Sequence, residues 1–324
     1  MHSRSILLTG GSGFLGSALL RHLARTEAFT IVAALRPTHQ AFASNVRTFP
    51  IDNLNATTQW ASAFEVPIDV VIHTAARVHV MSEVAADPLA EFREVNVEGT
   101  LNLARQAAIS GVSRFIFISS IKVNGENTDS GLAFKADDIA EPSDPYGVSK
   151  LEAEVGLRAL AAETGMEVVI IRPVLVYGPG VKANFLSMMR WLDRGFPLPL
   201  GSINNKRSLV SLDNLVDLIA TCMDHPNAAN QTFLVSDGDD VSTPDLLRRL
   251  GRAMGKPARL LSVPRWMMEA GAAVLGKSAM VQRLFGSLQV DISKNYELLG
   301  WRPVVTMDDA LRATAKNFLE SQKR

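Results

Sequence analysis

The sequence predicts an α/β protein built on a doubly wound parallel sheet, followed by a smaller C-terminal region. Short apolar runs alternate with stretches of helical spacing as far as Pro173. The runs are apolar throughout, which is typical of parallel strands covered by helices on both faces. The first run also ends in glycines that lead into a helix. Because ligands of such sheets bind beyond the carboxyl ends of the strands, we expect the functional site there.

The first strand and helix flank the segment TGGSGFLGSALL, residues 9–20, which spaces Gly10, Gly13 and Gly16 as GxxGxxG. Glycines between a strand and a helix let the backbone turn tightly and approach a pyrophosphate, whose charge then meets the positive end of the helix. This setting predicts a Rossmann-like dinucleotide site rather than an ordinary glycine-rich turn.

The remaining elements continue the alternation. Strands are expected at residues 6–9, 29–35, 69–76, 114–120 and 167–173, and helices at residues 17–26, 97–110 and 149–165. We expect residues 1–172 to form the dinucleotide-binding domain, with residues 208–236 returning to it. Residues 173–207 and 237–324, where turns and helices replace the strand pattern, are expected to form the substrate domain.

Length and composition limit the classes of function. The 324 residues carry 33 basic and 33 acidic side chains, which gives no reason to expect nucleic acid or a membrane surface as partner. The single cysteine, Cys222, excludes an internal disulfide and fits a reduced, cytoplasmic setting. No apolar run is long enough to span a membrane. Segment 266–286 is apolar enough for an interfacial helix, although packing on the substrate domain or on a dimer partner is favoured.

The end of the second strand bears on the choice of dinucleotide. An NAD site usually has a carboxylate there to bind the ribose 2′-hydroxyl, but no carboxylate occurs from Thr30 to Ile51. Arg36 stands there instead and can pair with a 2′-phosphate, so NADP is favoured over NAD. The alternative for Arg36 is a solvated side chain stacked on adenine. Asp52 and Asn53 follow the third strand and either bind the adenine or form a turn.

A second motif predicts acid–base chemistry. In DPYGVSKLEAE, Tyr146 and Lys150 are four residues apart and share one face of a helix. A cation one turn away is expected to stabilise the phenolate and lower the tyrosine pKa toward working pH. Ser120, at the end of a strand, is expected to hold a substrate oxygen beside Tyr146. Ser119 is the competing choice and is interpreted as a cofactor contact.

Other chemistries have little support. The six histidines show no metal-ligand spacing, and no GxSxG elbow is present. His73, at a strand end, is expected to pack near the cofactor. A catalytically silent dinucleotide sensor is an alternative, but Tyr146 and Lys150 are both present.

Together these motifs resemble the extended short-chain dehydrogenases/reductases that act on nucleotide sugars. The segments that carry the resemblance cover nearly the whole chain: GGSGFLG (10–16), HTAA (73–76), NVEGT (96–100), FISS (117–120), YGVSK (146–150), RPVLVYGPG (172–180), RSLVSLDNLVD (207–217) and LLGWRP (298–303). The resemblance implies catalysis by Ser120, Tyr146 and Lys150, with proton exchange between Tyr146 and the C4 oxygen of the sugar while hydride is exchanged at C4.

The resemblance also implies two sets of contacts. The expected cofactor contacts are Gly10, Gly13, Phe14, Leu15, Gly16, Arg36, Asp52, Asn53, Ala75, Ala76, Asn96, Ser119, Tyr146, Lys150 and Pro173. The expected substrate contacts are Ser120, Lys122, Asn184, Arg207, Arg283 and Leu288, with a UDP-sugar as substrate.

Several positions depart from the epimerase pattern. Leu175 replaces an asparagine that contacts the sugar, and Leu288 replaces a larger gate residue and leaves room for a 2-acetamido group. Lys122 and Asn124, in SSIKVNGE (119–126), resemble bacterial 4-reductases of polysaccharide synthesis. We therefore expect an NADPH-dependent 4-reductase of a UDP-4-keto-6-deoxy-N-acetylhexosamine; the alternative is a UDP-N-acetylglucosamine or UDP-glucose 4-epimerase with bound NAD.

The family resemblance also implies a homodimer. The expected contact is a four-helix arrangement made by segments 88–110 and 149–163 of two copies, although core packing explains their apolar positions equally well.

Overall fold

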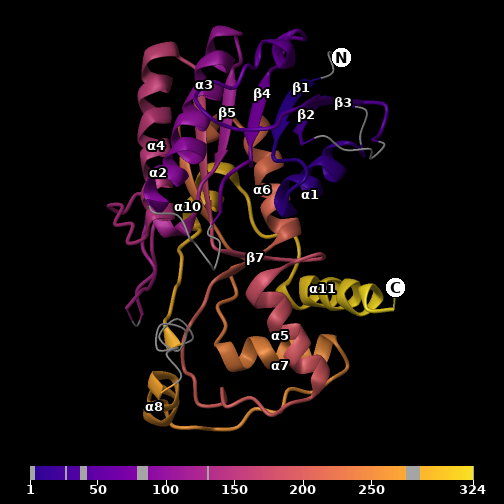
Figure 1. Ribbon diagram of the computed structural model, residues 1–324, viewed down its shortest axis with the longest axis vertical. Helices are drawn as coiled ribbons and strands as arrows, with labels where there is room; N and C mark the ends of the chain where they lie inside the picture. The colour runs from indigo at the N-terminus through magenta and orange to yellow at the C-terminus, as the bar shows by residue number, and fades with distance from the viewer. Residues whose placement is uncertain are drawn as a thin grey trace.

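Figure 1 shows the computed structural model, in which a sheet with helices on both sides lies above a smaller, mostly helical lobe. The structure describes residues 4–25, 28–36, 42–78, 87–129, 131–274 and 285–323, without the side chains of 270–274. The larger lobe holds most of the first half of the chain, and the smaller lobe carries helices α5, α7, α8 and α11.

Seven parallel strands form the main sheet in the order β3-β2-β1-β4-β5-β6-β9. Their bounds are β1 (Arg4–Thr9), β2 (Phe29–Leu35), β3 (Val46–Pro50), β4 (Val70–His73), β5 (Arg114–Ile118), β6 (Glu167–Pro173) and β9 (Thr232–Val235). The chain builds outward from β1 to β3 and then crosses back to β4, so the order reverses between β1 and β4. A doubly wound sheet binds its ligand at such a reversal, and the predicted fold class is confirmed.

Alternate residues of β1, β2, β4, β5 and β6 pack in two separate cores. Ile6 and Leu8 of β1 pack in one hydrophobic cluster, whereas Leu7 between them packs in another. Successive strand side chains point to opposite faces, so a strand buried on both sides must be apolar at every position. The continuous apolar runs of the sequence follow from this requirement.

Helices cover both faces of the sheet (Figure 1). One face carries α1 (Phe14–Leu23) and α6 (Leu212–Asp224), and the other carries α3 (Thr100–Ile109) and α4 (Pro145–Thr164). Short elements complete this lobe: η1 (Ala61–Phe64), α2 (Pro88–Arg93), η2 (Glu94–Gly99), η3 (Ile121–Val123), η4 (Pro226–Ala228) and α10 (Ser293–Leu299). The segment η2 is a π-helical turn that joins α2 to α3 without a break.

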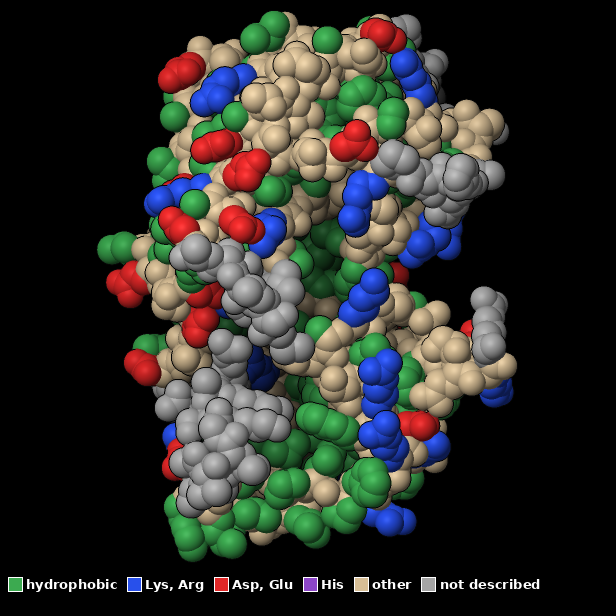
Figure 2. Space-filling view, viewed as in Figure 1, with side chains coloured by type: hydrophobic (Ala, Val, Ile, Leu, Met, Phe, Trp, Pro, Cys, Tyr) green, Lys and Arg blue, Asp and Glu red, His purple; other side chains and the backbone are tan. Residues whose placement is uncertain are grey.

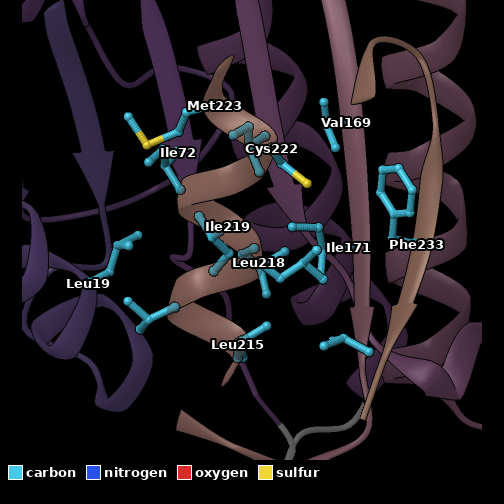
Figure 3. Close-up of a cluster of buried hydrophobic side chains, with 14 of the residues drawn as sticks. Leu19, Ile72, Val169, Ile171, Leu215, Leu218, Ile219, Cys222, Met223 and Phe233 are labelled. Carbon is cyan, nitrogen blue, oxygen red and sulfur yellow. The ribbon is translucent and has the colours of Figure 1, made fainter. Parts of the chain in front are cut away.

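Helix α6 fills the centre of the first cluster (Figure 3). Its side chains Leu215, Leu218 and Ile219 lie against the sheet together with Cys222. The Cys222 side chain is fully buried, and burial raises the pKa of its thiol to about 12. It therefore packs as a small apolar side chain, as its setting in the sequence predicts.

The smaller lobe has its own core. It contains α5 (Ala183–Arg194), α7 (Thr243–Ala253), α8 (Arg265–Val274) and α11 (Met307–Ser321), with a two-stranded sheet of β7 (Leu175–Tyr177) and β8 (Leu209–Ser211). Side chains of α5, α7 and α11 share one cluster with Tyr177, which stacks on Phe185. In the part of the chain that the structure describes, no helix has the length and apolarity needed to cross a bilayer. The domain division expected from the sequence stays a prediction, although β9, from segment 208–236, does pair with β6 in the main sheet.

Candidate active site

The three spaced glycines form a tight turn between β1 and α1. Gly10 has φ +72°, and a Cβ there would lie 2.6 Å from Thr74 Oγ1 and 2.7 Å from the Ala75 nitrogen. A Cβ on Gly16 would lie 2.6 Å from the Gly10 carbonyl carbon. Gly13 is less crowded, because its added Cβ would meet only the Gly10 oxygen, at 3.1 Å. Gly10 and Gly16 are therefore required by close backbone packing.

The beginning of α1 suits a diphosphate. Gly13 is the N-cap residue and provides no side-chain cap, and the first turn, which includes Phe14 and Leu15, carries no acidic residue. The first N–H groups of a helix have no partner within it, and the positive end of the helix dipole favours an anion. This donor set and the glycine-rich turn fit the diphosphate of a dinucleotide.

The residues expected around the adenosine lie at the ends of β2 and β3. Arg36 follows β2 directly and is exposed, and Asp52 and Asn53 are exposed just after β3. The Ile51 nitrogen donates to the Leu35 carbonyl (2.9 Å), which holds these two strand ends together. The structure thus places Arg36, Asp52 and Asn53 at the same edge as the glycine turn.

His73 is a structural residue at the end of β4. Its Nδ1 lies 2.7 Å from Thr9 Oγ1 and its Nε2 lies 2.9 Å from Thr100 Oγ1, so both ring nitrogens are hydrogen-bonded. Burial, with the nearby Lys150 charge, lowers its pKa to about 3. A neutral imidazole held on both sides packs under the site and cannot shuttle protons near neutral pH.

Asn96 joins the loop after β4, which contains Ala75 and Ala76, to helix α4. Its carboxamide accepts from the Arg77 nitrogen (2.9 Å) and donates to the Arg77 carbonyl (3.1 Å) and to Ser149 Oγ (3.0 Å). The π-helical turn η2 brings this buried side chain to the loop. Asn96 therefore fixes the loop; its direct contact with a cofactor stays a prediction.

Ser120 and Tyr146 meet at the carboxyl end of β5. Ser120 caps η3, where its Oγ accepts from the Lys122 nitrogen (3.3 Å), and it also hydrogen-bonds to Tyr146. Tyr146 lies in the first turn of α4, whose N-cap Asp144 accepts from the Gly147 nitrogen (2.6 Å). The expected serine–tyrosine pair is therefore assembled.

The electrostatics of Tyr146 and Lys150 differ from the sequence-based expectation. The pKa of Tyr146 is raised to about 12, first by burial and then by the Asp144 charge, while the Ser120 hydrogen bond opposes the rise. The Lys150 ammonium, only 2% exposed, donates to the Ile118 carbonyl (2.9 Å) and lies over the Phe117 ring. Burial lowers the pKa of Lys150 to about 7. The expected lowering of the tyrosine pKa by Lys150 is thus wrong, because burial and the Asp144 charge raise the pKa of Tyr146.

Lys122 forms a charged cluster beside the pair. Its ammonium contacts the Asp144 carboxylate and lies 3.2 Å from Glu126 Oε1. One positive charge between two carboxylates moderates the negative field of Asp144 at the Tyr146 hydroxyl. Lys122 is two-thirds buried and next to Ser120, which is compatible with its expected contact with substrate.

Ser119 points away from Ser120 into a buried ionic network. Its hydroxyl donates to Glu154 (2.6 Å), and Arg172 donates to both carboxylate oxygens of Glu154 (2.9 and 2.6 Å). Arg172 also donates to Asn124 Oδ1 (2.9 Å). The Ser119 side chain is thus committed to Glu154 and its backbone nitrogen to the Ile171 carbonyl (2.8 Å), and the expected cofactor contact stays a prediction. Asn124 is likewise a structural partner.

The expected substrate residues are spread over the second lobe. Asn184 is exposed at the beginning of α5, and Arg207 is paired with the Gly286 carbonyl (3.1 Å) next to the bridge with Leu288. Leu288 is 7% exposed and packs in the first hydrophobic cluster. Leu175 is half exposed in β7, and Arg283 lies outside the described residues.

A hollow separates the two lobes in Figure 2, with hydrophobic side chains at its base and Lys and Arg side chains along one rim. Pro173 is buried at the end of β6, where the chain passes to β7 of the second lobe. The carboxyl ends of the strands point toward this lobe, so the glycine turn and the Ser120–Tyr146 pair lie on the same side of the sheet as the hollow.

Sequence reasoning missed Glu154, Arg172 and Asp144. Glu154 follows Lys150 by one helical turn, in the motif that predicts the catalytic pair. A carboxylate on the same helix face as the predicted lysine was the available signal, because a charge that is buried is almost always paired.

Comparisons with known proteins agree with this arrangement. The model of the NAD dependent epimerase/dehydratase family matches residues 6–236. A UDP-glucose 4-epimerase of Vibrio cholerae is 53% identical over 99% of this chain and 97% of its own length. Among solved structures, UDP-glucuronic acid 4-epimerase from Bacillus cereus, in complex with NAD, has a TM-score of 0.78 at 22% identity and covers 98% of this chain and 99% of its own.

A further solved structure binds the phosphorylated cofactor. RMD from Pseudomonas aeruginosa, complexed with NADPH, has a TM-score of 0.73 at 23% identity and covers 98% of this chain and 99% of its own. Proteins of this fold therefore include examples with either dinucleotide.

Proposed function

Since this chain belongs to the NAD-dependent epimerase/dehydratase family and is an NAD(P)-dependent enzyme, we propose that it is a UDP-sugar 4-epimerase that retains NAD. The observation that carries the proposal is the 53% identity with a UDP-glucose 4-epimerase over nearly the full length of both chains. The proposal takes the alternative of the sequence analysis in preference to the 4-reductase. It includes UDP-N-acetylglucosamine beside UDP-glucose as a substrate, because Leu288 is small for a gate residue.

The residues of the site have distinct roles in this proposal. Ser120 holds the C4 oxygen of the sugar, and Tyr146, which must be ionised in the loaded site, accepts its proton as hydride leaves C4. The reverse transfers, to the opposite face of a sugar that has turned over, give the epimer. A bound NAD supplies the hydride acceptor for the first transfer and the donor for the second. Lys150 holds the nicotinamide ribose and places a positive charge one turn from the phenol.

The cofactor and the sugar nucleotide are held by different lobes in the proposal. The glycine turn and the beginning of α1 bind the diphosphate of NAD, with Asp52, Asn53, Ala75 and Ala76 beside the adenosine. Asn184, Arg207 and Arg283 bind the UDP diphosphate, and Lys122 contacts the sugar. A homodimer and a cytoplasmic location, both expected from the sequence, belong to the same proposal.

One observation favours a second candidate, the NADPH-dependent 4-reductase. Arg36 is exposed at the end of β2, and no carboxylate occurs among residues 28–36 and 42–51 of the described chain. An exposed guanidinium there suits a 2′-phosphate better than a 2′-hydroxyl. A net reduction consumes NADPH, whereas an epimerase regenerates its bound NAD.

The test separates the two candidates by product and by cofactor. The purified protein is incubated with UDP-glucose or UDP-N-acetylglucosamine, and in parallel with a UDP-4-keto-6-deoxy-N-acetylhexosamine plus NADPH. Interconversion of gluco and galacto epimers by NMR, with no net loss of reduced-nicotinamide absorbance, supports the epimerase. Loss of that absorbance with the keto sugar alone overturns the epimerase and establishes the reductase.

A further inference from the structure

Helix α4 carries a fully buried carboxylate one turn after Lys150. The side chain of Glu154 is 0% exposed and receives short hydrogen bonds from Ser119, directly after β5, and from Arg172 of β6. It thus ties α4 to two adjacent strands at the edge where the site lies. Ser119 directly precedes Ser120, and the Lys150 ammonium donates to the carbonyl of Ile118, the residue before Ser119.

Few elements place charged groups around Lys150 and Glu154. Lys150 faces the neutral His73 from β4, Glu154 from its own helix, and the Phe117 ring from β5. The charged groups facing Glu154 are Arg172, which is 3% exposed, and the half-exposed Arg158 at 3.4 Å.

Two charged side chains of neighbouring elements are paired elsewhere. On α2, Arg93 forms an ion pair with Glu152 on the outer side of α4. On η3, Lys122 contacts Asp144. Glu154 is therefore the one described carboxylate that is buried with Lys150 on the inner side of α4, and its hydrogen bonds hold it there.

We infer that Glu154 is a positioning residue for the catalytic pair: its buried charge keeps Lys150 in the ammonium form, and its hydrogen bonds fix the end of β5 that presents Ser120. The activity test of this inference rests on the proposed function, because it assumes that turnover requires the Lys150 cation. The charge effect has support in the pKa of Lys150, which burial lowers to about 7 and which Glu154 pushes back up. Removal of the carboxylate should therefore deprotonate Lys150 at lower pH.

The test compares Glu154→Gln with Glu152→Gln, which removes the same charge from the exposed side of the same helix. Ser119→Ala removes a hydrogen bond of Glu154 but keeps its charge. Turnover requires protonated Lys150, so activity falls as pH rises through the lysine pKa. We expect the alkaline limb of the pH–rate profile to move down by about one pH unit in Glu154→Gln. It should stay in place in Glu152→Gln and Ser119→Ala.

A stability measurement tests the inference without relying on activity. Between pH 7 and about 10.5 the unfolded lysine binds more protons than the native one, so stability to urea rises with pH across this window. In Glu154→Gln this rise should begin at lower pH, even if the protein proves not to be an epimerase.

Glu154→Gln leaves Arg172 buried without its partner, so a double variant with Arg172→Met guards against failure to fold. Its alkaline limb and its urea profile should shift in the same direction. Equal profiles in the wild type and either folded Glu154 variant overturn the inference. A lower overall rate with an unshifted limb means that Glu154 only supports the fold.

Discussion

Replacement of Gly16 by alanine should weaken dinucleotide binding far more than replacement of Gly13. A Cβ added at Gly16 would lie 2.6 Å from the Gly10 carbonyl carbon and 2.8 Å from Thr74 Oγ1. These neighbours are backbone and a hydrogen-bonded side chain, since Thr74 Oγ1 donates to the Thr9 carbonyl (2.7 Å). Neither can rotate away, so the turn must move by roughly 1 Å to reach ordinary contact.

The expected magnitude follows from that movement. Overpacking of this kind costs about 1–3 kcal/mol of stability. A shift of roughly 1 Å also breaks a hydrogen bond of ordinary length between a backbone N–H and a phosphate oxygen. One such charge-assisted bond contributes about 2 kcal/mol, so the dissociation constant for NAD should rise about 30-fold. For Gly13→Ala, whose Cβ meets one oxygen at 3.1 Å, we expect a change below about threefold.

Isothermal titration of NAD into protein stripped of nucleotide measures both constants, and thermal melting without nucleotide reports the fold. If Gly16→Ala binds NAD as the wild type does, or if the two variants weaken binding equally, then the turn does not contact the diphosphate in the way its geometry suggests.

Three further predictions concern single side chains. Tyr146→Phe should lower turnover by about 10²–10⁴-fold while the dissociation constant for NAD stays within about threefold, as seen by stopped assay and titration; near-normal turnover would remove the tyrosine from acid–base catalysis. Arg36→Ala should weaken NADPH more than NADH in competitive binding if the guanidinium faces a 2′-phosphate, and equal weakening would refute that role. The pKa of His73 is lowered to about 3, so below pH 6.5 the unfolded state binds more protons than the native state and stability falls. In His73→Gln the urea midpoint should therefore depend less on pH between pH 6.5 and 4, and an unchanged pH dependence would contradict this.

The parts of the fold that sequence predicts best are those where one physical requirement decides the residue. Strands such as β2 and β6 are buried on both faces, so their apolar runs could be read directly, and the glycine turn is fixed by spacing and setting. The expected range of α4 begins four residues too late, although the Asp144 cap and Pro145 are helix-start signals that the sequence carries. The π-helical turn η2 leaves no periodic signal over six residues.

The site was harder to predict where it depends on side-chain direction. Neighbouring serines 119 and 120 look alike in sequence, yet the extended strand sends their hydroxyls to opposite sides, one toward Glu154 and the other toward Tyr146. The rise of the Tyr146 pKa depends on burial, which spacing along a helix does not report. Sequence predicts Ser120, Tyr146 and Lys150 as the reacting groups, whereas the proton affinities of Tyr146 and Lys150 require the packed structure.

Because of the π-helical turn η2, the residues of α2 and those of α3 can each face their own partners. An α-helix advances about 100° per residue, so one extra residue in a turn changes the phase of everything that follows it. Helix α2 can thus keep Phe92 against Tyr146 while α3 keeps Thr100 against His73. Deletion of one residue from η2 would restore a regular helix and could improve its local hydrogen bonding. It would also turn Asn96 away from Arg77, so a more regular helix would come with a less ordered loop after β4.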